Sequence, residues 1–195
     1  MKKFKFLLGI ILCTTLISCG EIKQALQVVN CQYNLDGVVR PAIAGVSLSN
    51  ITNPSQLSIT DVAKIALAFT NKSFPLSLTV NVKATNPGNV AATIQQLDWA
   101  IDLEGQRDFL QGSVSQAINV PAGGGSTLIP FSINADLLKL ISGETKDNLL
   151  NLALSIANIG ESSSKVSIRV RPTVTIAGQP ISTGFITLSK TISSK

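Results

Sequence analysis

The side chains able to carry out covalent or acid–base catalysis are few in this sequence. Its 195 residues contain no histidine, which excludes nucleophiles that depend on an imidazole base, as in Ser-His-Asp and Cys-His arrangements. Ser162 and Lys165 have the Ser-x-x-Lys spacing of penicillin-binding enzymes. Those enzymes also need Ser-Asp-Asn and Lys-Thr-Gly elements, which the chain lacks, and a serine at a helix start, whereas this segment is expected to open a strand. We therefore expect no enzyme.

Four carboxylates cluster in the middle of the chain: Asp98, Asp102, Glu104 and Asp108. On one face of a strand, Asp98 and Asp102 would lie about 13 Å apart at ~3.3 Å per residue. Paired acid–base catalysis needs about 5 to 9.5 Å between its carboxyl groups. A calcium loop needs oxygen ligands at every second position around a glycine turn, a pattern that is also absent. The cluster is expected to be a solvated face, with no metal and no cofactor.

Three other features have structural interpretations. Gly123-Gly124-Gly125 could present backbone amides to a phosphate, but no lysine follows and strands flank it, so a hairpin loop is expected. Trp99 falls on the apolar face of a predicted strand and is expected in the core. Cys31 lies in an alternating apolar pattern from Val29 to Leu35, which predicts a buried thiol on a strand face.

The one predicted site of chemical modification is Cys19. Three lysines, at positions 2, 3 and 5, precede an apolar run from Phe6 to Ile17. About twelve residues fit a signal peptide and fall short of the ~20 needed for a transmembrane helix. The run ends in Leu16-Ile17-Ser18-Cys19-Gly20, which resembles the lipobox of bacterial lipoproteins. This resemblance implies cleavage before Cys19 and its acylation; the alternative is an ordinary signal peptide with a chance cysteine.

Cleavage changes the charge balance from which partners are inferred. The whole chain has 16 basic and 11 acidic residues, a net charge of +5; without the three lysines of the signal, 13 basic residues remain and the charge is +2. The basicity therefore gives no support to nucleic acid as a partner. The expected partner is the membrane, reached through the lipid, with a lipid or an envelope protein as further candidates. The residue after Cys19 is Gly20 and not the aspartate that is associated with inner-membrane retention in enteric bacteria. The expected location is therefore the outer membrane, facing the periplasm.

Alternating apolar residues predict a domain built mainly of strands. The clearest runs are Leu76 to Ala84 and Leu97 to Leu103. Further strands are predicted at Val46 and Leu48, from Leu110 through Val114 to Ile118 and Val120, from Ile129 to Ile133, and over 165–176 and 181–192. Turn sequences separate them, including Asn86-Pro87-Gly88 and Glu104-Gly105-Gln106. In strand 165–176, Arg169 and Arg171 are expected to face water, and Pro172 predicts an edge position or a bend.

Helical patterns are fewer. Val62, Ile65, Ala66 and Phe69 recur at helical spacing after Thr60, which is the predicted N-cap. Asn134 is expected to cap a short turn that runs to Ile141. Residues 147–158 fit both a helix and a strand, and Asp147 and Gly160 at their ends favour the helix.

These patterns predict a mainly β fold: an antiparallel β-sandwich of the immunoglobulin or fibronectin III type, with two or three short helices. The expected organisation is a lipoprotein signal peptide over 1–18, a lipidated tether over 19–28 and one sandwich domain over 29–192. Residues 20–27 could extend at most about 26 Å, so the domain is expected close to its membrane.

The middle of the chain also resembles a known family. A strand that ends in Asn86-Pro87-Gly88 is followed by the strand Leu97 to Leu103, then by Val120-Pro121-Ala122-Gly123 and the strand through Ile129-Pro130-Phe131-Ser132-Ile133. This order resembles the late embryogenesis abundant (LEA) type 2 domain, also called the WHy domain, over roughly residues 76–135. The resemblance implies a sandwich without a catalytic constellation, a role in stress protection and, in some relatives, lipid binding. The predicted helices at 60–70 and 136–158 depart from the family.

The expected function is that of a membrane-anchored periplasmic lipoprotein acting as a non-enzymatic binding or structural module, associated with envelope or stress protection. The alternative is a lipid-binding or lipid-transfer module that holds acyl chains in an apolar cavity, either between the sheets or beneath the helices.

Overall fold

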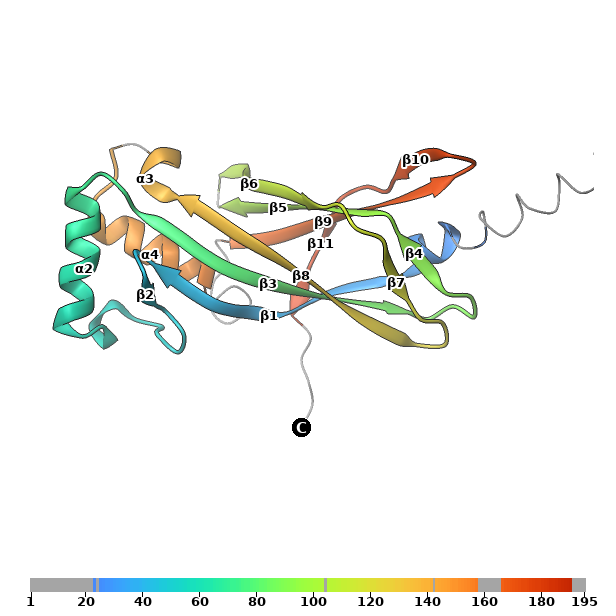
Figure 1. Cartoon of the computed structure of the whole chain (residues 1–195), viewed down its shortest axis with the longest axis horizontal. Helices are drawn as coiled ribbons and strands as arrows, with labels where there is room; N and C mark the ends of the chain where they lie inside the picture. Colours follow the sequence, from blue (N-terminus) through green and yellow to red (C-terminus); the bar gives the residue numbers. More distant parts are fainter. Residues whose placement is uncertain (1–22, 24, 104, 142, 158–165, 191–195) are drawn as a thin grey trace, which may run out of the picture.

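The computed structural model describes residues 23, 25–103, 105–141, 143–157 and 166–190 (Figure 1). Residues 25–30 form a short N-terminal helix. The strands are β1 (Gln32–Ile43), β2 (Val46–Ser47), β3 (Pro75–Asn86), β4 (Ala92–Ile94), β5 (Gln96–Leu103), β6 (Gln106–Val114), β7 (Ile118–Val120), β8 (Gly125–Asp136), β9 (Val166–Ile176), β10 (Gln179–Ser182), β11 (Ile186–Thr187) and β12 (Ser189–Lys190). The other helices are η1 (Pro54–Gln56), α2 (Ile59–Thr70), α3 (Leu137–Leu140) and α4 (Lys146–Ala157).

Two sheets carry the fold. One has the order β12-β1-β3-β8, with β2 beside β1, and the other has the order β10-β9-β5-β6, with β11 beside β9. Strands β4 and β7 form a separate two-stranded pair. The pairings are antiparallel except that of β1 with β12, which is parallel. The predicted fold class, a mainly β antiparallel sandwich with short helices, is confirmed.

Strand alternation explains how the first sheet is built. Along β3 every second residue from Leu76 to Asn86 is buried, as expected when one sheet face meets a core. Its partner β8 pairs with it over the full length, from Pro75 opposite Asp136 to Asn86 opposite Gly125. This register places the apolar residues of both strands on the same inward face.

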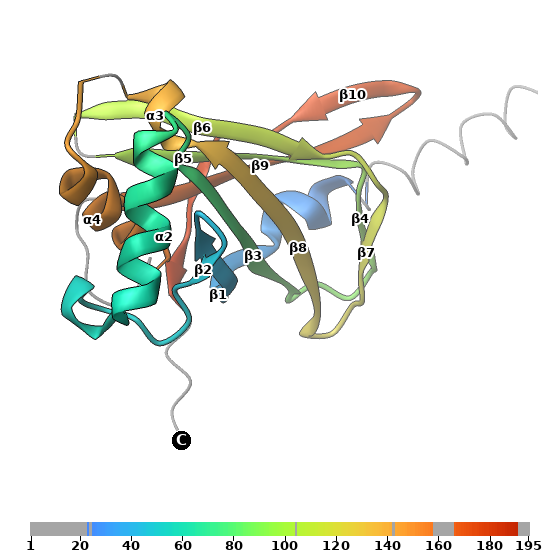
Figure 2. The same ribbon diagram turned by 60° about the vertical axis from the view of Figure 1, so that its left-hand side comes forward.

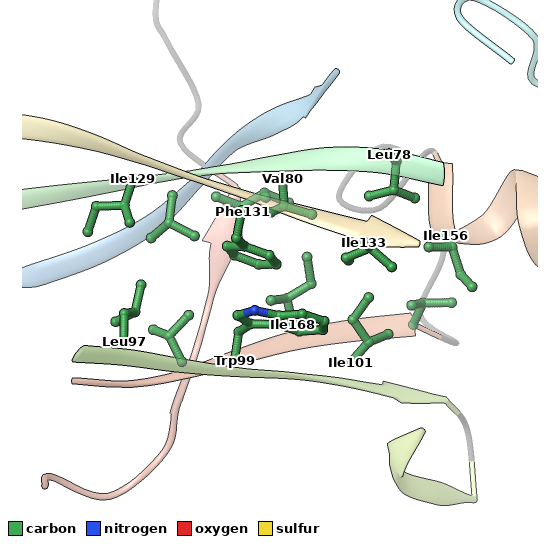
Figure 3. Packing of buried hydrophobic residues seen from close by; sticks show 14 of the residues in the cluster. Leu78, Val80, Leu97, Trp99, Ile101, Ile129, Phe131, Ile133, Ile156 and Ile168 are labelled. Atoms are coloured by element: carbon green, nitrogen blue, oxygen red, sulfur yellow. The ribbon is translucent and has the colours of Figure 1, made fainter. Parts of the chain in front are cut away.

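The core lies between the two sheets (Figure 3). The rings of Trp99 on β5 and Phe131 on β8 stack across the space, with centroids 4.8 Å apart and planes at 11°. Leu97 and Ile101 on β5 face Ile129 and Ile133 on β8, and Ile168 on β9 and Ile156 on α4 fill in around them. Trp99 is therefore a core residue, as predicted.

The helices α2, α3 and α4 gather at one end of the molecule, whereas helix 25–30 lies toward the other end (Figures 1 and 2). The ambiguous segment 147–158 is helical as α4, which buries six apolar residues: Leu149, Leu150, Ala153, Leu154, Ile156 and Ala157. Two predicted N-caps are wrong. Ser58, not Thr60, caps α2, and Asp136, not Asn134, caps α3, because in each case that side chain accepts a helix amide.

The later strands differ from the prediction in their extent. The strand predicted from Leu110 to Val120 is interrupted, because β6 ends at Val114 and Ile118 to Val120 pair with β4 instead. The segment predicted as one strand over 181–192 contains three short pieces, β10, β11 and β12. The strand predicted at Val46 and Leu48 is only the two-residue β2.

Pro172 does not mark an edge strand. Strand β9 lies between β5 on one side and β10 and β11 on the other. Pairing with β10 covers Thr173 to Ile176 and pairing with β11 covers Arg169 and Val170. The imide nitrogen of Pro172 has no hydrogen to donate, and the residue lies where neither short strand pairs with β9.

Candidate functional site

The predicted carboxylate cluster is an ion-pair network on the outer face of the second sheet. Arg169 on β9 donates from Nη2 to Asp102 on β5 and to Asp108 on β6, each at 2.8 Å, and from Nε to Asp102. Beside it, Arg171 donates to Asp98 at 3.1 and 2.9 Å. The network therefore ties three neighbouring strands together.

Burial distinguishes this network from an ordinary surface pair. The side chain of Arg169 is 8% exposed and that of Asp102 14%. Phe185 covers both guanidinium groups, with its ring centroid 4.5 Å from Arg169 Cζ and 4.8 Å from Arg171 Cζ, a distance at which a cation is attracted to an aromatic face. The prediction of a solvated face is wrong for Asp98 and Asp102.

Within the network, Asp102 and Arg169 stabilise each other in their charged forms. Hydrogen bonds from Arg169 hold the pKa of Asp102 below its usual range, against the opposing effect of burial. Hydrogen bonding to Asp102 raises the pKa of the Arg169 guanidinium, again against burial. A general acid needs a carboxyl group that keeps its proton near neutral pH, and Asp102 is driven in the opposite direction. Asp102 is therefore suited to holding Arg169 in place and not to acting as a general acid.

The sequence could not reveal this pairing. Arg171 lies directly opposite Asp98 in the β5–β9 ladder, and Arg169 lies opposite Ala100, between the two aspartates. These partners are more than sixty residues apart in the chain. Only the register between two distant strands brings them together. Arg169, predicted to face water, is buried, whereas Arg171 pairs with Asp98 and keeps 41% of its side chain exposed. Glu104, the fourth carboxylate, is outside the described residues.

Gly123 and Gly124 lie in the loop between β7 and β8, in agreement with the predicted loop, and Gly125 is the first residue of β8. The amide of Gly123 donates to the carbonyl oxygen of Gly88 at 2.7 Å, and that of Gly124 to Asn86 at 2.8 Å. The amide of Gly125 donates to Ala122 at 3.2 Å. Because these three amides already have acceptors within the protein, they are not arranged to cradle a phosphate.

Cys31 is buried, as predicted, but it lies between helix 25–30 and β1 rather than within a strand. It is 6% exposed and lies beside Tyr33, whose hydroxyl donates to the carbonyl oxygen of Val28 at 3.2 Å. Burial raises the pKa of the Cys31 thiol, and a thiol that stays protonated is a poor nucleophile. Val29, predicted on the same strand face, instead lies in helix 25–30 and is 58% exposed.

The two other sequence candidates cannot be placed. Cys19, the predicted lipidation site, and the Ser162–Lys165 motif lie outside the described residues. Within the described ranges, no group of three or more histidine, cysteine, aspartate or glutamate residues is arranged to hold a metal ion. In the same part of the chain, no helix combines the length and the apolar character that crossing a membrane requires.

An apolar groove that the sequence did not predict lies at the end of the molecule that carries helix 25–30. The groove has a volume of about 440 Å³, within the range of roughly 300 to 1,000 Å³ for small-molecule sites. One wall is helix 25–30 and the other is formed by β9, β10 and the residues that follow. Its lining residues are Ala25, Leu26, Val29, Val174, Ile176, Ile181, Ser182, Thr183 and Gly184.

Two features of the sequence point to this groove in retrospect. Residues 172–189 form a run of 18 without a charged side chain, and residues 24–35 are also uncharged. The groove was missed because residues 20–27 were expected to extend as a tether, whereas residues 25–30 are helical and bury Ala25 and Val28. One helix turn thus presents Leu26 and Val29 beside a strand that lies about 150 residues later in the chain.

No family model matches the chain, and no curated protein matches it. A crystal structure of a protein from Archaeoglobus fulgidus is similar at 15% identity and a TM-score of 0.37, covering 82% of this chain and 99% of that chain. A solution structure of a candidate LEA protein is similar at 14% identity and a TM-score of 0.33, covering 91% of this chain and 86% of that chain. TM-scores this low establish neither family nor function, and the class that the coordinates themselves define is a mainly β sandwich.

Proposed function

We propose that the mature chain is a membrane-anchored periplasmic lipoprotein whose sandwich domain is a non-enzymatic binding or structural module of the cell envelope. The anchor is the acylated Cys19, and the membrane is the outer membrane. The observation that carries the proposal is the signal sequence that ends in Leu16-Ile17-Ser18-Cys19, with the folded domain beginning only six residues after the cysteine. Two or more acyl chains suffice for stable anchoring.

The described residues support a non-enzymatic role. Asp98, Asp102 and Asp108 hold arginines rather than a substrate. Cys31 is buried, and the glycine amides are used within the protein. The resemblance of residues 76–135 to the LEA type 2 domain supports a part in envelope or stress protection. Deletion of the gene is therefore expected to sensitise cells to osmotic or drying stress rather than to remove a metabolic activity.

The anchoring is tested by a Cys19→Ser variant expressed in its bacterial host. It is expected to lose incorporation of labelled fatty acid and to leave the membrane fraction. Cys31→Ser is the matched control, since it removes the other cysteine of the mature chain and should keep both label and membrane association. Density separation of the two membranes should place the unaltered protein in the outer one. Unchanged labelling and fractionation of Cys19→Ser would refute the anchor.

A second candidate function, lipid carriage, is favoured by the apolar groove. The space between the sheets is filled by the core, including the Trp99–Phe131 stack, which argues against the acyl chain predicted there. Beneath the helices, a pocket of about 290 Å³ beside α4 is lined partly by Glu144, Asn148 and Asn151. The larger groove beside helix 25–30 has no charged residue in its lining and suits an acyl chain better. Mass spectrometry of the purified protein tests this function, because a carrier should retain non-covalent lipid in a fixed ratio to the chain.

A further inference from the structure

We propose that the groove between helix 25–30 and β10 is the face that rests on the anchoring membrane, with the boundary between lipid headgroups and acyl chains as its occupant. This inference rests on the proposed function, because it takes Cys19 as the anchor. It adds a second, non-covalent contact that would fix the orientation of the domain. The face is defined by the apolar side chains that project from its two walls: Leu26, Val29 and Ile181.

The projection of these side chains favours a surface contact over an enclosed ligand. Leu26 is 56% exposed, Val29 58% and Ile181 48%. The deeper residues of the groove, Ala25 and Val174, are almost fully buried and belong to the core. An enclosing pocket would bury most of a ligand's surface within concave walls. Here the apolar groups point outward along the rims, as they do where a protein enters the interfacial region of a bilayer.

The charge distribution agrees with this contact. The groove is built from two uncharged stretches, residues 24–35 and 172–189, in a chain where 14% of residues are charged. A charged side chain that entered the acyl region would lose its hydration at a high cost. Lys23 is exposed at the start of the same helix, one turn before Leu26. Its ammonium can therefore reach lipid phosphates while Leu26 enters the layer below them.

The length of chain between the anchor and the groove makes the membrane the nearest partner. Ala25 lies six positions after Cys19, and six Cα-to-Cα steps span at most about 22 Å in any conformation. The lining residues at positions 25, 26 and 29 are thus held close to the bilayer that contains the acyl chains. Apart from Lys23, no described residue outside this helix lies so close to Cys19 along the chain.

The resulting orientation places a second apolar surface away from the membrane. Ile59 and Leu67 on α2 are 91% and 61% exposed, and α2 lies at the end opposite helix 25–30 (Figure 1). Helix α2 also carries the charged residues Asp61 and Lys64, whereas the walls of the groove carry no charged residue. The end with α2, α3 and α4 would then face the periplasm.

The test uses the whole mature protein, lipidated at Cys19 and reconstituted into vesicles of phosphatidylethanolamine and phosphatidylglycerol. A thiol-reactive fluorophore is placed at Ile181→Cys or, as the matched position, at Leu67→Cys. Cys31 is buried, and the unsubstituted protein measures any label that it takes. The vesicles include a phospholipid that carries a quencher near its glycerol backbone. Fluorescence from a label at position 181 should fall by more than half, while fluorescence from a label at position 67 should stay nearly constant.

Substitutions in the other wall then test whether the groove itself makes the contact. Adding Leu26→Ser and Val29→Ser to the protein labelled at position 181 should restore most of its fluorescence. Leu128→Ser, at a residue 53% exposed on β8, is the control and should restore none.

The outcomes separate this inference from the proposed function. Protein that carries no acyl chain and does not enter vesicles would refute the anchor itself. Protein that is anchored but is quenched equally at positions 181 and 67 would refute the docking face alone. One non-covalent lipid per chain, retained after purification and found by mass spectrometry, would also overturn the docking face, since the groove would then be a carrier site.

Discussion

The environment of Arg169 in the structure differs from the one that its position in the sequence predicts. In the sequence it occupies an outward position on a strand, where a solvated side chain is expected. In the fold it is 8% exposed and contacts Asp102 and Asp108. Buried charges of this kind are strongly destabilising when one partner is removed, because the other remains desolvated. The stability of the second sheet should therefore depend on this residue far more than on other charged positions.

We expect Asp102→Asn to lower the free energy of unfolding by about 2 to 3 kcal/mol, as for a hydrogen bond to a buried charge. Removing one partner of a buried ion pair typically costs about 3 to 5 kcal/mol. The loss is expected at the lower end of this range or below it, because Asp108 still contacts Arg169 in the variant. Lys139→Gln is the control. Its side chain is 79% exposed and 3.8 Å from Asp136, and such surface pairs contribute less than about 1 kcal/mol. Denaturant unfolding measures both, and equal losses would contradict the buried role.

The same aspartate predicts how stability depends on pH. Arg169 lowers the pKa of Asp102 in the folded state, whereas an unfolded aspartate titrates near about 3.9. Its contribution is therefore fully present above the unfolded pKa and is lost as the pH falls through the lower, folded pKa. Unfolding curves measured from pH 7 down to pH 2 should show a steeper acid loss in the unaltered protein than in Asp102→Asn. Parallel pH profiles would contradict this linkage.

Gly112 is a second position where one residue controls the packing. It lies directly opposite Trp99 in the β5–β6 pair, and an added Cβ would come within 2.5 Å of the indole. Gly112→Ala should therefore displace the ring from its stack on Phe131 and destabilise the fold by about 1 to 3 kcal/mol, as for overpacked cores. Trp99 is the only tryptophan, so its fluorescence reports the shift. Gly37→Ala, where nothing lies within 4 Å, should leave the emission unchanged.

At the scale of elements, α2 depends on a cap that the sequence pattern placed two residues too late. Ser58 Oγ accepts the amide of Asp61 at 3.1 Å, which satisfies one of the free donors at the helix start. Ser58→Ala should cost the helix about 1 kcal/mol, and Thr60→Ala should cost little because Thr60 is already helical. Amide hydrogen exchange in α2 measures both; faster exchange in Thr60→Ala alone would identify Thr60 as the cap.

The elements that the sequence predicted well share a physical reason. Strands β3, β5 and β8 each bury one face against a single core, so a period of two appears in their own residues. Caps were misplaced because several serine, threonine and asparagine residues near each helix start satisfy the same pattern. The sequence also did not predict that residues 181–190 are divided among short strands. These strands are defined by their partners, since β10 and β11 pair with β9 and β12 pairs with β1.

The candidate sites were predicted less well than the strands, for a related reason. The lipidation motif is local, and a continuous run of residues is enough to predict it. The ion pairs and the groove each depend on segments brought together from distant parts of the chain. The groove joins residues near position 26 to residues near position 181, and no periodicity within either segment indicates the other. Its only local sign is the absence of charge on both sides.

At the scale of the whole molecule, helix 25–30 links the predicted anchor to the sandwich. Val28 is fully buried, and its carbonyl oxygen accepts the hydroxyl of Tyr33 on β1. The next residue, Val29, faces the groove and is 58% exposed. One helix thus has a core-facing side and a side available to the membrane. The buried residues of this helix begin at Ala25, six positions after Cys19.

This division predicts opposite behaviour for two adjacent valines. Val28→Ser should lower the free energy of unfolding by about 1.5 to 3 kcal/mol, which is the free energy gained by burying a valine side chain. This loss is expected because Val28 belongs to the core. Val29→Ser should leave that free energy nearly unchanged, because it removes only exposed surface. Both are measured by denaturant unfolding in the unlipidated Cys19→Ser background. If Val28→Ser proved as mild as Val29→Ser, residues 25–30 would be a tether that merely touches the sandwich, and the groove would lose its fixed wall.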